Sequence, residues 1–166
     1  MSVIKTFSEF INESTWNSRP DISRGTFGAK KVITTNRDLR KKIEELYKEQ
    51  GEGDTLDVSS LTNRIKCDDL SHLFIILKDV KYIIGLEDWD VSHVEDMDGM
   101  FMGCKNFNSD LSKWDVSNVK NMNSMFWNCK KFNSDLSKWD VSGVEDMEDM
   151  FNDCKSLKQI PSWYKE

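Results

Sequence analysis

The 25-residue motif LSKWDVSNVKNMNSMFWNCKKFNSD, residues 111–135, is the middle one of three similar copies in this chain, and this repeat decides the fold. The copy before it, LEDWDVSHVEDMDGMFMGCKNFNSD, covers residues 86–110, and the shorter copy after it, LSKWDVSGVEDMEDMFNDCKSL, covers residues 136–157. Self-similarity at a fixed period of about 20 to 50 residues is typical of arrays of stacked structural units. We therefore expect the copies to form successive coils of one array.

The positions that do not vary among the copies are large and apolar, whereas the positions between them change charge and size. A single coil cannot bury its own apolar face, so its neighbours must cover it. We expect like residues of successive coils to stack about 4.8 Å apart, as neighbouring strands do, and to form the core. In the middle copy these positions are Leu111, Trp114, Val116, Val119, Met122, Met125, Phe126 and Cys129.

The spacing of the apolar residues predicts two kinds of local structure within each copy. The pattern VxxMxxMFxxC, residues 119–129 in the middle copy, favours a short helix or 3₁₀ turn. The pattern FNSDLSKWDV, residues 107–116, alternates imperfectly and leads into Asp-Val-Ser, where the aspartate can bond backbone N–H groups and close a turn. We therefore expect a strand, a turn and a short helix in each coil.

The consensus LSxWDVSxVxxMxxMFxxCxxFNxD over residues 86–157 resembles the repeat of the BspA-like leucine-rich-repeat family, found in bacterial surface proteins and in gut-associated and phage-borne genomes. The resemblance implies an open, curved solenoid with a protein-binding or adhesive role and no enzymatic activity. The family's arrays are often longer and carry secretion or anchoring signals. The fold class we predict is α/β, a short leucine-rich-repeat-like solenoid with an α-helical N-terminal cap.

Five segments are predicted along the chain. A helix is expected after residue 34, because Thr35 or Asn36 can cap an amphipathic run that ends before Gly51. The segments are an amphipathic stretch and mobile linker at 1–31, the capping helix at 32–55, a degenerate first coil at 56–85, three repeats at 86–157 and a C-terminal cap at 158–166.

The first thirteen residues leave two interpretations open. Ile4, Phe7 and Phe10 lie at helical spacing, so this stretch can be an amphipathic helix that covers the main body. It is also similar to the N-terminal segments that direct internal proteins into the heads of tailed phages and end in a hydrophobic-x-Glu site for the head protease. In that interpretation, Ile11 and Glu13 form the processing site.

Catalytic and metal-binding motifs are not apparent in the sequence. Cys104, Cys129 and Cys154 follow the repeat period and no C-x-x-C pair occurs, which favours core packing over a disulfide or a metal site. His72 and His93 have no partner at ligand spacing. We therefore predict no enzymatic activity, no cofactor and no metal.

Two columns of aspartate recur with the repeat, which would place like charges one coil apart. Two interactions could offset the repulsion between these carboxylates: hydrogen bonds from the N–H groups of turns, or a row of bound Ca²⁺ ions. Asn108 and Asn133 are expected to bond the backbone of a neighbouring coil. The columns are Asp90, Asp115 and Asp140, and Asp110 and Asp135.

Candidate partner contacts come from the variable positions of the repeat. Met102 and Trp127 follow the invariant Met-Phe pair, where the repeat does not require a large apolar side chain, so they can form an exposed patch or pack under other residues. Asp88, Lys113 and Lys138 share a second variable position. These five residues are our candidates for contact with a protein partner.

Composition narrows the classes of function. The net charge is −6, and no apolar run approaches the roughly 20 residues that span a bilayer. The acidic repeats would repel phosphate, which disfavours nucleic acid as a partner. The N-terminus lacks the apolar core of a secretory signal, so we expect the cytoplasm of a bacterial host or packaging in a virion.

The predicted function is a non-enzymatic protein–protein interaction module built on a repeat solenoid. The alternative is a structural or packaged cargo component of a phage particle, directed there by the N-terminal peptide.

Overall fold

The structure is a computed structural model that describes residues 31–165. These residues belong to one compact unit. The amphipathic stretch and nearly all of the linker predicted at the N-terminus lie outside the described residues.

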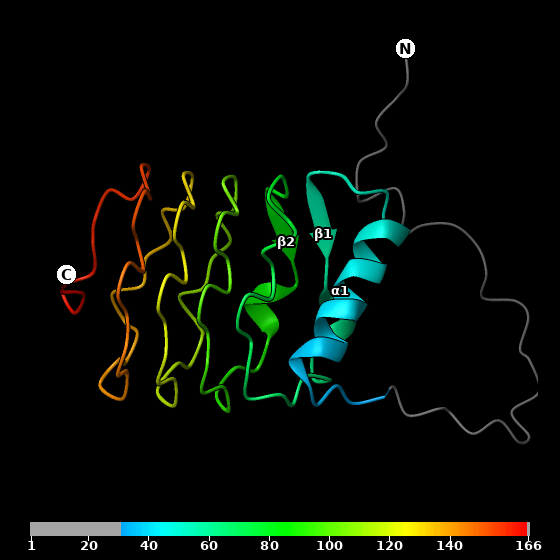
Figure 1. The fold of residues 1–166 in the computed structure, drawn as a ribbon, viewed down its shortest axis with the longest axis horizontal. Coiled ribbons are helices and arrows are strands. Elements are labelled where there is room, and N and C mark those ends of the chain that lie inside the picture. Colours follow the sequence, from blue (N-terminus) through cyan, green and yellow to red (C-terminus); the bar gives the residue numbers. More distant parts are fainter. Residues whose placement is uncertain (1–30, 166) are drawn as a thin grey trace, which may run out of the picture. The chain divides into compact units, whose positions relative to one another are not determined.

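The helix α1, Asn36–Glu49, begins and ends where the sequence predicts. Thr35 is its N-cap, and the Thr35 hydroxyl accepts a hydrogen bond from the Asp38 N–H at 3.2 Å, which satisfies one of the free donors of the first turn. The buried face of α1 joins the core of the coils, and Figure 1 shows the helix lying against the first coil. The buried residues of α1 are Leu39, Ile43 and Leu46.

Two short strands and two 3₁₀ turns follow α1. The strands β1, Thr55–Asp57, and β2, Tyr82–Ile84, pair in parallel, with Leu56 opposite Ile83. Gly85 follows β2 at φ +81°, and a Cβ at this position would lie 2.6 Å from the Ser59 Cα, so only glycine fits there without a shift of the backbone. The 3₁₀ turns are η2, Ser59–Leu61, and η3, Leu86–Asp88.

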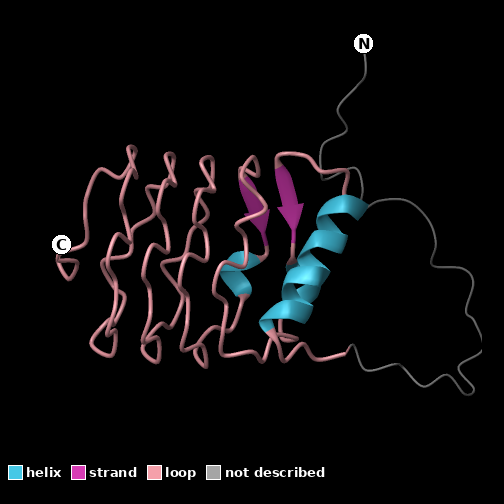
Figure 2. Ribbon diagram, in the orientation of Figure 1, coloured by secondary structure: helices cyan, strands magenta, loops and turns pink. Residues whose placement is uncertain are grey.

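The predicted fold class, an α/β leucine-rich-repeat-like solenoid with a strand, a turn and a short helix in each coil, is wrong. Residues 89–165 contain no helix and no strand, and Figure 2 shows them as loops and turns. Residues with positive φ interrupt each copy, for example Ser124 at 51° and Asn128 at 59°, and a left-handed residue ends both a helix and a strand. Within residues 31–165, the α-helical and β-strand elements are limited to α1, β1 and β2.

The copies nevertheless lie side by side along the unit (Figure 1). Isolated parallel bridges join Asp69 to Asp96, Asp96 to Asn121 and Asn121 to Asp146, so equivalent residues of successive coils are neighbours. The coils are therefore held by contacts between equivalent turns, not by a continuous sheet.

A column of phenylalanine rings runs through the core of the stack. Phe74, Phe101, Phe126 and Phe151 follow one another with ring centroids 5.2, 5.6 and 5.7 Å apart and planes within 8° of parallel. Phe101 and Phe126 are fully buried, whereas Phe151 in the last copy is 8% exposed. Burying a ring of this size contributes roughly 1.5 to 3 kcal/mol, so the column is a major source of stability.

Candidate functional site

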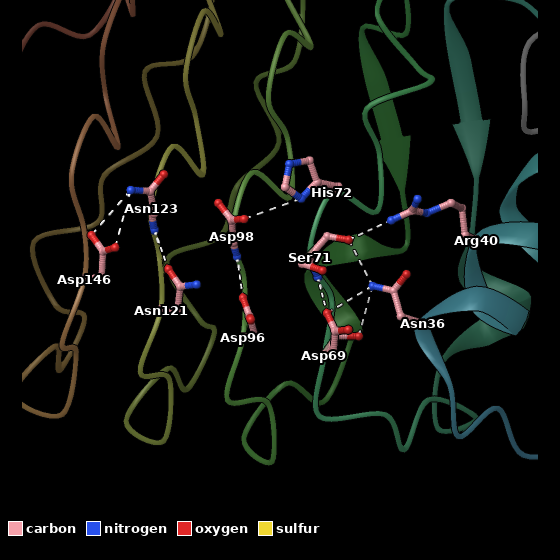
Figure 3. A network of polar contacts seen from close by, with 10 residues as sticks. All are labelled: Asn36, Arg40, Asp69, Ser71, His72, Asp96, Asp98, Asn121, Asn123 and Asp146. Atoms are coloured by element: carbon pink, nitrogen blue, oxygen red, sulfur yellow. Dashed lines mark hydrogen bonds and ion pairs between the residues drawn. The ribbon is translucent and has the colours of Figure 1, made fainter.

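Four equivalent turns of the stack carry the polar network drawn in Figure 3, together with two side chains of α1. We call them the turn ladder, defined as residues 69–76, 96–103, 121–128 and 146–153. Each turn opens with an aspartate or asparagine whose side-chain oxygen accepts a hydrogen bond from the N–H two residues on, and Figure 3 draws the bonds that Asp69, Asp96 and Asn121 accept. The four bonds are Asp69 to Ser71 at 2.7 Å, Asp96 to Asp98 at 2.8 Å, Asn121 to Asn123 at 3.0 Å and Asp146 to Glu148 at 2.9 Å.

Backbone hydrogen bonds join each of the first three turns of the turn ladder to the following turn at alternate residues. In the turn 96–103, N–H groups of alternate residues donate to carbonyl groups of the turn 121–128 at 2.8 to 3.0 Å. The left-handed residues in each turn reorient the peptide planes so that these donors all face the following coil. The donor and acceptor pairs are Met97 and Asn121, Gly99 and Asn123, Phe101 and Met125, and Gly103 and Trp127.

The sequence carries a signal for this geometry that the helix prediction overlooked. Gly103, Asn128 and Asp153 occupy one position of the repeat, and all three have positive φ. Glycine, asparagine and aspartate are the residue types that tolerate the left-handed region best. A position that alternates among these three types therefore indicates a left-handed turn residue rather than a helix.

An acidic row lies on the exposed side of the turn ladder. It consists of Asp69, Asp96, Asp98 and Asp146, with Asn121 interrupting the charges between Asp96 and Asp146 (Figure 3). Burial raises the pKa of Asp98, and the neighbouring carboxylates raise it further, while His72, whose Nδ1 lies 3.6 Å from the Asp98 carboxylate, lowers it. The row therefore concentrates negative charge that a cation from a partner would neutralise.

An apolar strip runs through the turn ladder near the end of its first three turns. Ile75, Met102 and Trp127 occupy the same position in successive turns, and Trp127 is 38% exposed while the other two are half-buried. Ile76, next to Ile75, is 44% exposed and was not among the residues that the sequence singled out. The structure thus brings Met102 and Trp127 together, and their role in partner binding remains a prediction.

The three charged candidates lie away from the turn ladder. Lys113 and Lys138 are exposed and line one shallow groove with Asp110 and Asp135, while Asp88 is exposed at the end of η3. The structure therefore separates these candidates from Met102 and Trp127. The candidate processing residues Ile11 and Glu13 lie outside the described part of the chain.

The aspartate columns close turns, as one of the two interpretations predicted. Asp115 Oδ1 accepts hydrogen bonds from the Ser117 hydroxyl at 2.7 Å and the Ser117 N–H at 3.1 Å, and these bonds lower the pKa of Asp115. Within residues 31–165, no group of three or more His, Cys, Asp or Glu side chains is arranged to hold a metal ion. Equivalent bonds to the backbone N–H occur at Asp90, Asp110, Asp135 and Asp140.

Cysteine and asparagine side chains tie each coil to a neighbouring coil. The Cys129 thiol donates to the Phe101 carbonyl at 3.0 Å, and the Asn108 Oδ1 accepts from the Asn133 N–H at 2.8 Å, which confirms the predicted packing and backbone-bonding roles. Burial raises the pKa of the Cys104 thiol to about 12. All four cysteines are free thiols, so these side chains serve the stack.

Comparison with known proteins places this repeat-built chain in a family. Residues 42–165 match the family described as "Mycoplasma protein of unknown function, DUF285", and because the match covers most of the chain, the protein belongs to that family. The searches of curated proteins and of solved structures found no significant match. Among residues 31–165, no helix is long and apolar enough to cross a membrane.

Proposed function

We propose that the protein is a non-enzymatic module that binds a protein partner through the turn ladder. One observation carries this proposal: a partly exposed tryptophan that the core does not require, Trp127, lies in an apolar strip of the turn ladder, which also carries the acidic row. The invariant residues of the repeat are used in the core and in turn closure, so the variable residues of this face are available for contact. The resemblance of the repeat to BspA-like leucine-rich repeats, which implies protein binding, supports the same function.

The chemistry of the face indicates the kind of partner. Tryptophan is among the residues that most often dominate binding energy at interfaces, particularly when a pocket of the partner encloses it. The carboxylates of Asp96 and Asp98 lie in the same turn as Met102, so a partner that combines an apolar pocket with lysine or arginine would complement both features. The proposed partner is therefore a basic protein surface with an apolar recess.

Affinity capture with the purified full chain tests the proposal. Partners recovered with the wild-type chain are identified by mass spectrometry, purified and titrated against Trp127→Ser and against the matched control Tyr82→Ser. Tyr82 is 49% exposed on β2, so the control removes a similarly exposed aromatic side chain elsewhere. We expect Trp127→Ser to weaken binding by about tenfold or more, the effect of a central interface residue, and Tyr82→Ser by less than about twofold.

Asp98→Asn extends the experiment to the acidic row. We expect it to slow association and to reduce the dependence of affinity on salt, because a rim charge acts mainly on the association rate. The proposal would be overturned if Trp127→Ser and Asp98→Asn bound every recovered partner as tightly as the control Tyr82→Ser does. Preserved melting temperatures of the variants are required for the comparison.

A further inference from the structure

The two ends of the turn ladder are terminated differently. At the first turn, side chains from α1 replace a preceding coil: the Asn36 Nδ2 donates to the carbonyl oxygens of Asp69 at 3.2 Å and Ser71 at 3.0 Å. The Arg40 Nη2 donates to the Ser71 carbonyl at 2.9 Å, and Figure 3 shows both side chains reaching this edge. The acceptors at the first edge are therefore occupied by α1.

The last turn is covered in part by the C-terminal segment, because the rings of Trp163 and Tyr164 pack against Phe151 with centroids 6.2 and 5.1 Å away. Alternate N–H groups of the turn 121–128 donate to carbonyls of the turn 146–153, but the equivalent N–H groups of that last turn have no hydrogen-bond partner among residues 31–165. The carbonyl of Glu145 also lacks, within the same residues, the two N–H donors that its counterpart Lys120 receives from the next coil. The donors without a partner in residues 31–165 are the backbone N–H groups of Met147, Asp149, Phe151 and Asp153.

Side chains of the last copy are also less buried than the equivalent side chains of the first two copies. Val141, Val144 and Met147 are only partly buried, whereas their counterparts in the first two copies are buried. A hollow of about 750 Å³ opens beside Phe151, with three acidic residues and one lysine among the residues that line it. The charged lining residues are Glu148, Asp149, Asp153 and Lys165.

We propose that this edge, residues 145–153, binds an extended segment of a protein partner in parallel orientation. The segment donates two N–H groups to the Glu145 carbonyl and then presents four carbonyls, at alternate residues, to the four unpaired donors. Adding a segment to an open edge takes its affinity from main-chain hydrogen bonds and its specificity from side chains. Lysine or arginine in the segment would complement Glu148, Asp149 and Asp153, of which Asp153 also pairs with Lys155 at 3.2 Å.

A second copy of the chain does not satisfy the same edge. Head-to-tail association would need the carbonyls of Asp69 and Ser71, which α1 already occupies. Tail-to-tail association would place N–H donors of residues 147–153 against identical donors. The occupant is therefore a different protein, and this inference is independent of the Trp127 face proposed above.

The chain itself shows how a suitable segment is held. Residues 121–127 present carbonyls to the N–H groups of the preceding coil, and residues 119–131, VKNMNSMFWNCKK, carry three lysines and no acidic residue. A synthetic peptide of this sequence, with Cys129→Ser to prevent oxidation, is therefore the probe. The matched control peptide is residues 144–156, VEDMEDMFNDCKS, with Cys154→Ser, which has the same repeat positions but is acidic.

Amide hydrogen exchange of the full chain, followed by NMR, tests the proposal. Without peptide, we expect the N–H groups of Met147, Asp149, Phe151 and Asp153 to exchange rapidly and those of residues 122–128 that bond the next coil to be protected. The basic peptide at saturation should slow the four amides by about tenfold or more, in contrast to the acidic peptide. Protection of other amides only, or of none, would overturn the proposal.

A pair of variants tests the charge complementarity. Asp149→Asn with Asp153→Asn removes two charges from the edge, and asparagine tolerates their positive φ. We expect the basic peptide to bind about threefold to tenfold more weakly at low salt, whereas the control Asp110→Asn with Asp135→Asn should leave its affinity unchanged. Equal effects of the two pairs, or self-association that protects the four amides without peptide, would contradict the proposed occupant.

Discussion

The Trp114 indole Nε1 donates a hydrogen bond to the Leu86 carbonyl of the preceding coil at 3.1 Å. Trp139 makes the equivalent bond to Leu111 at 3.0 Å. Each bond ties a buried ring of one coil to the backbone of another, so the tryptophans align along the stack. Trp89, in the first copy, differs because its buried Nε1 has no partner in the described part of the chain.

This difference predicts unequal effects for the same substitution. Trp114→Phe removes one of the two donors to the Leu86 carbonyl, which keeps the Trp89 N–H at 3.2 Å. It should lower the free energy of unfolding by about 1 kcal/mol more than Trp89→Phe, which removes an unpaired donor. Trp114→Ala should cost about 3 to 5 kcal/mol because it opens a cavity between two coils. Urea denaturation measures all three, and equal losses for the two phenylalanine variants would contradict the assignment of the bond.

Three glycine-to-alanine substitutions should lower the free energy of unfolding by different amounts, in a fixed order. Gly85→Ala combines a positive φ with a Cβ that would lie 2.6 Å from the Ser59 Cα, and we expect a loss of about 2 to 4 kcal/mol in the free energy of unfolding. Gly103→Ala, at φ +77° with open space around it, should lose about 1 kcal/mol. Gly53→Ala is the control with no expected loss, and chemical denaturation that reversed this order would refute the backbone geometry.

The Asn36 side chain should contribute to the stability of the first coil. Asn36→Ala removes the donor that serves the Asp69 and Ser71 carbonyls, and we expect a loss of about 1 to 3 kcal/mol with faster amide exchange in residues 69–76. Arg37→Ala is the control, because the Arg37 side chain is 90% exposed. Similar melting temperatures for the two variants would show that α1 does not act as a cap.

Stability should fall on acidification. The Ser117 hydroxyl and N–H hold the pKa of Asp115 below its usual 3.8, and serine lowers the pKa of Asp90, Asp110, Asp135 and Asp140 similarly. Because the folded pKa lies below the unfolded one, the unfolded state binds protons first, and the stabilisation present above about pH 4 is lost as the pH falls further.

Urea denaturation between about pH 7 and about pH 2.5 measures this loss. Asp115→Asn keeps the side-chain acceptor but removes the titrating group, so its stability should depend less on pH than that of the wild type. Asp79→Asn, an exposed aspartate outside the Asp-x-Ser turns, is the control. An unchanged pH dependence in Asp115→Asn would exclude this aspartate as a source of acid sensitivity.

Thiol reactivity should follow burial. Burial raises the pKa of Cys154 to about 11 and that of Cys104 to about 12, so little thiolate exists near neutral pH. We expect iodoacetamide to label the half-buried Cys154 first and Cys104 only as the chain unfolds, as read by mass spectrometry. The urea-unfolded chain, in which all four thiols should react alike, is the control, and rapid labelling of native Cys104 would contradict the packing.

Sequence patterns predicted local features where the deciding interactions are close in the chain. Thr35 caps a helix whose apolar residues recur at helical spacing, and both signals lie within or next to α1 itself. Asp115 bonds a serine only two residues away, so the turn could be recognised from its sequence. The candidate face was found only in part: Trp127 stood out as an apolar residue at a variable position, whereas Ile75 and Ile76 did not.

By itself, the sequence determined the period of the coils, the residues of the core and the chemical class of its buried side chains. Only the tertiary structure decided that residues 89–165 form neither strands nor helices, because Ser124 and Asn128 adopt positive φ to suit hydrogen bonds with other coils. It also decided that Asn36 closes one edge of the turn ladder, while at the other edge the N–H groups of Met147, Asp149, Phe151 and Asp153 have no hydrogen-bond partner among residues 31–165. Backbone pairing across about 25 residues depends on three-dimensional proximity, which the spacing of residue types does not contain.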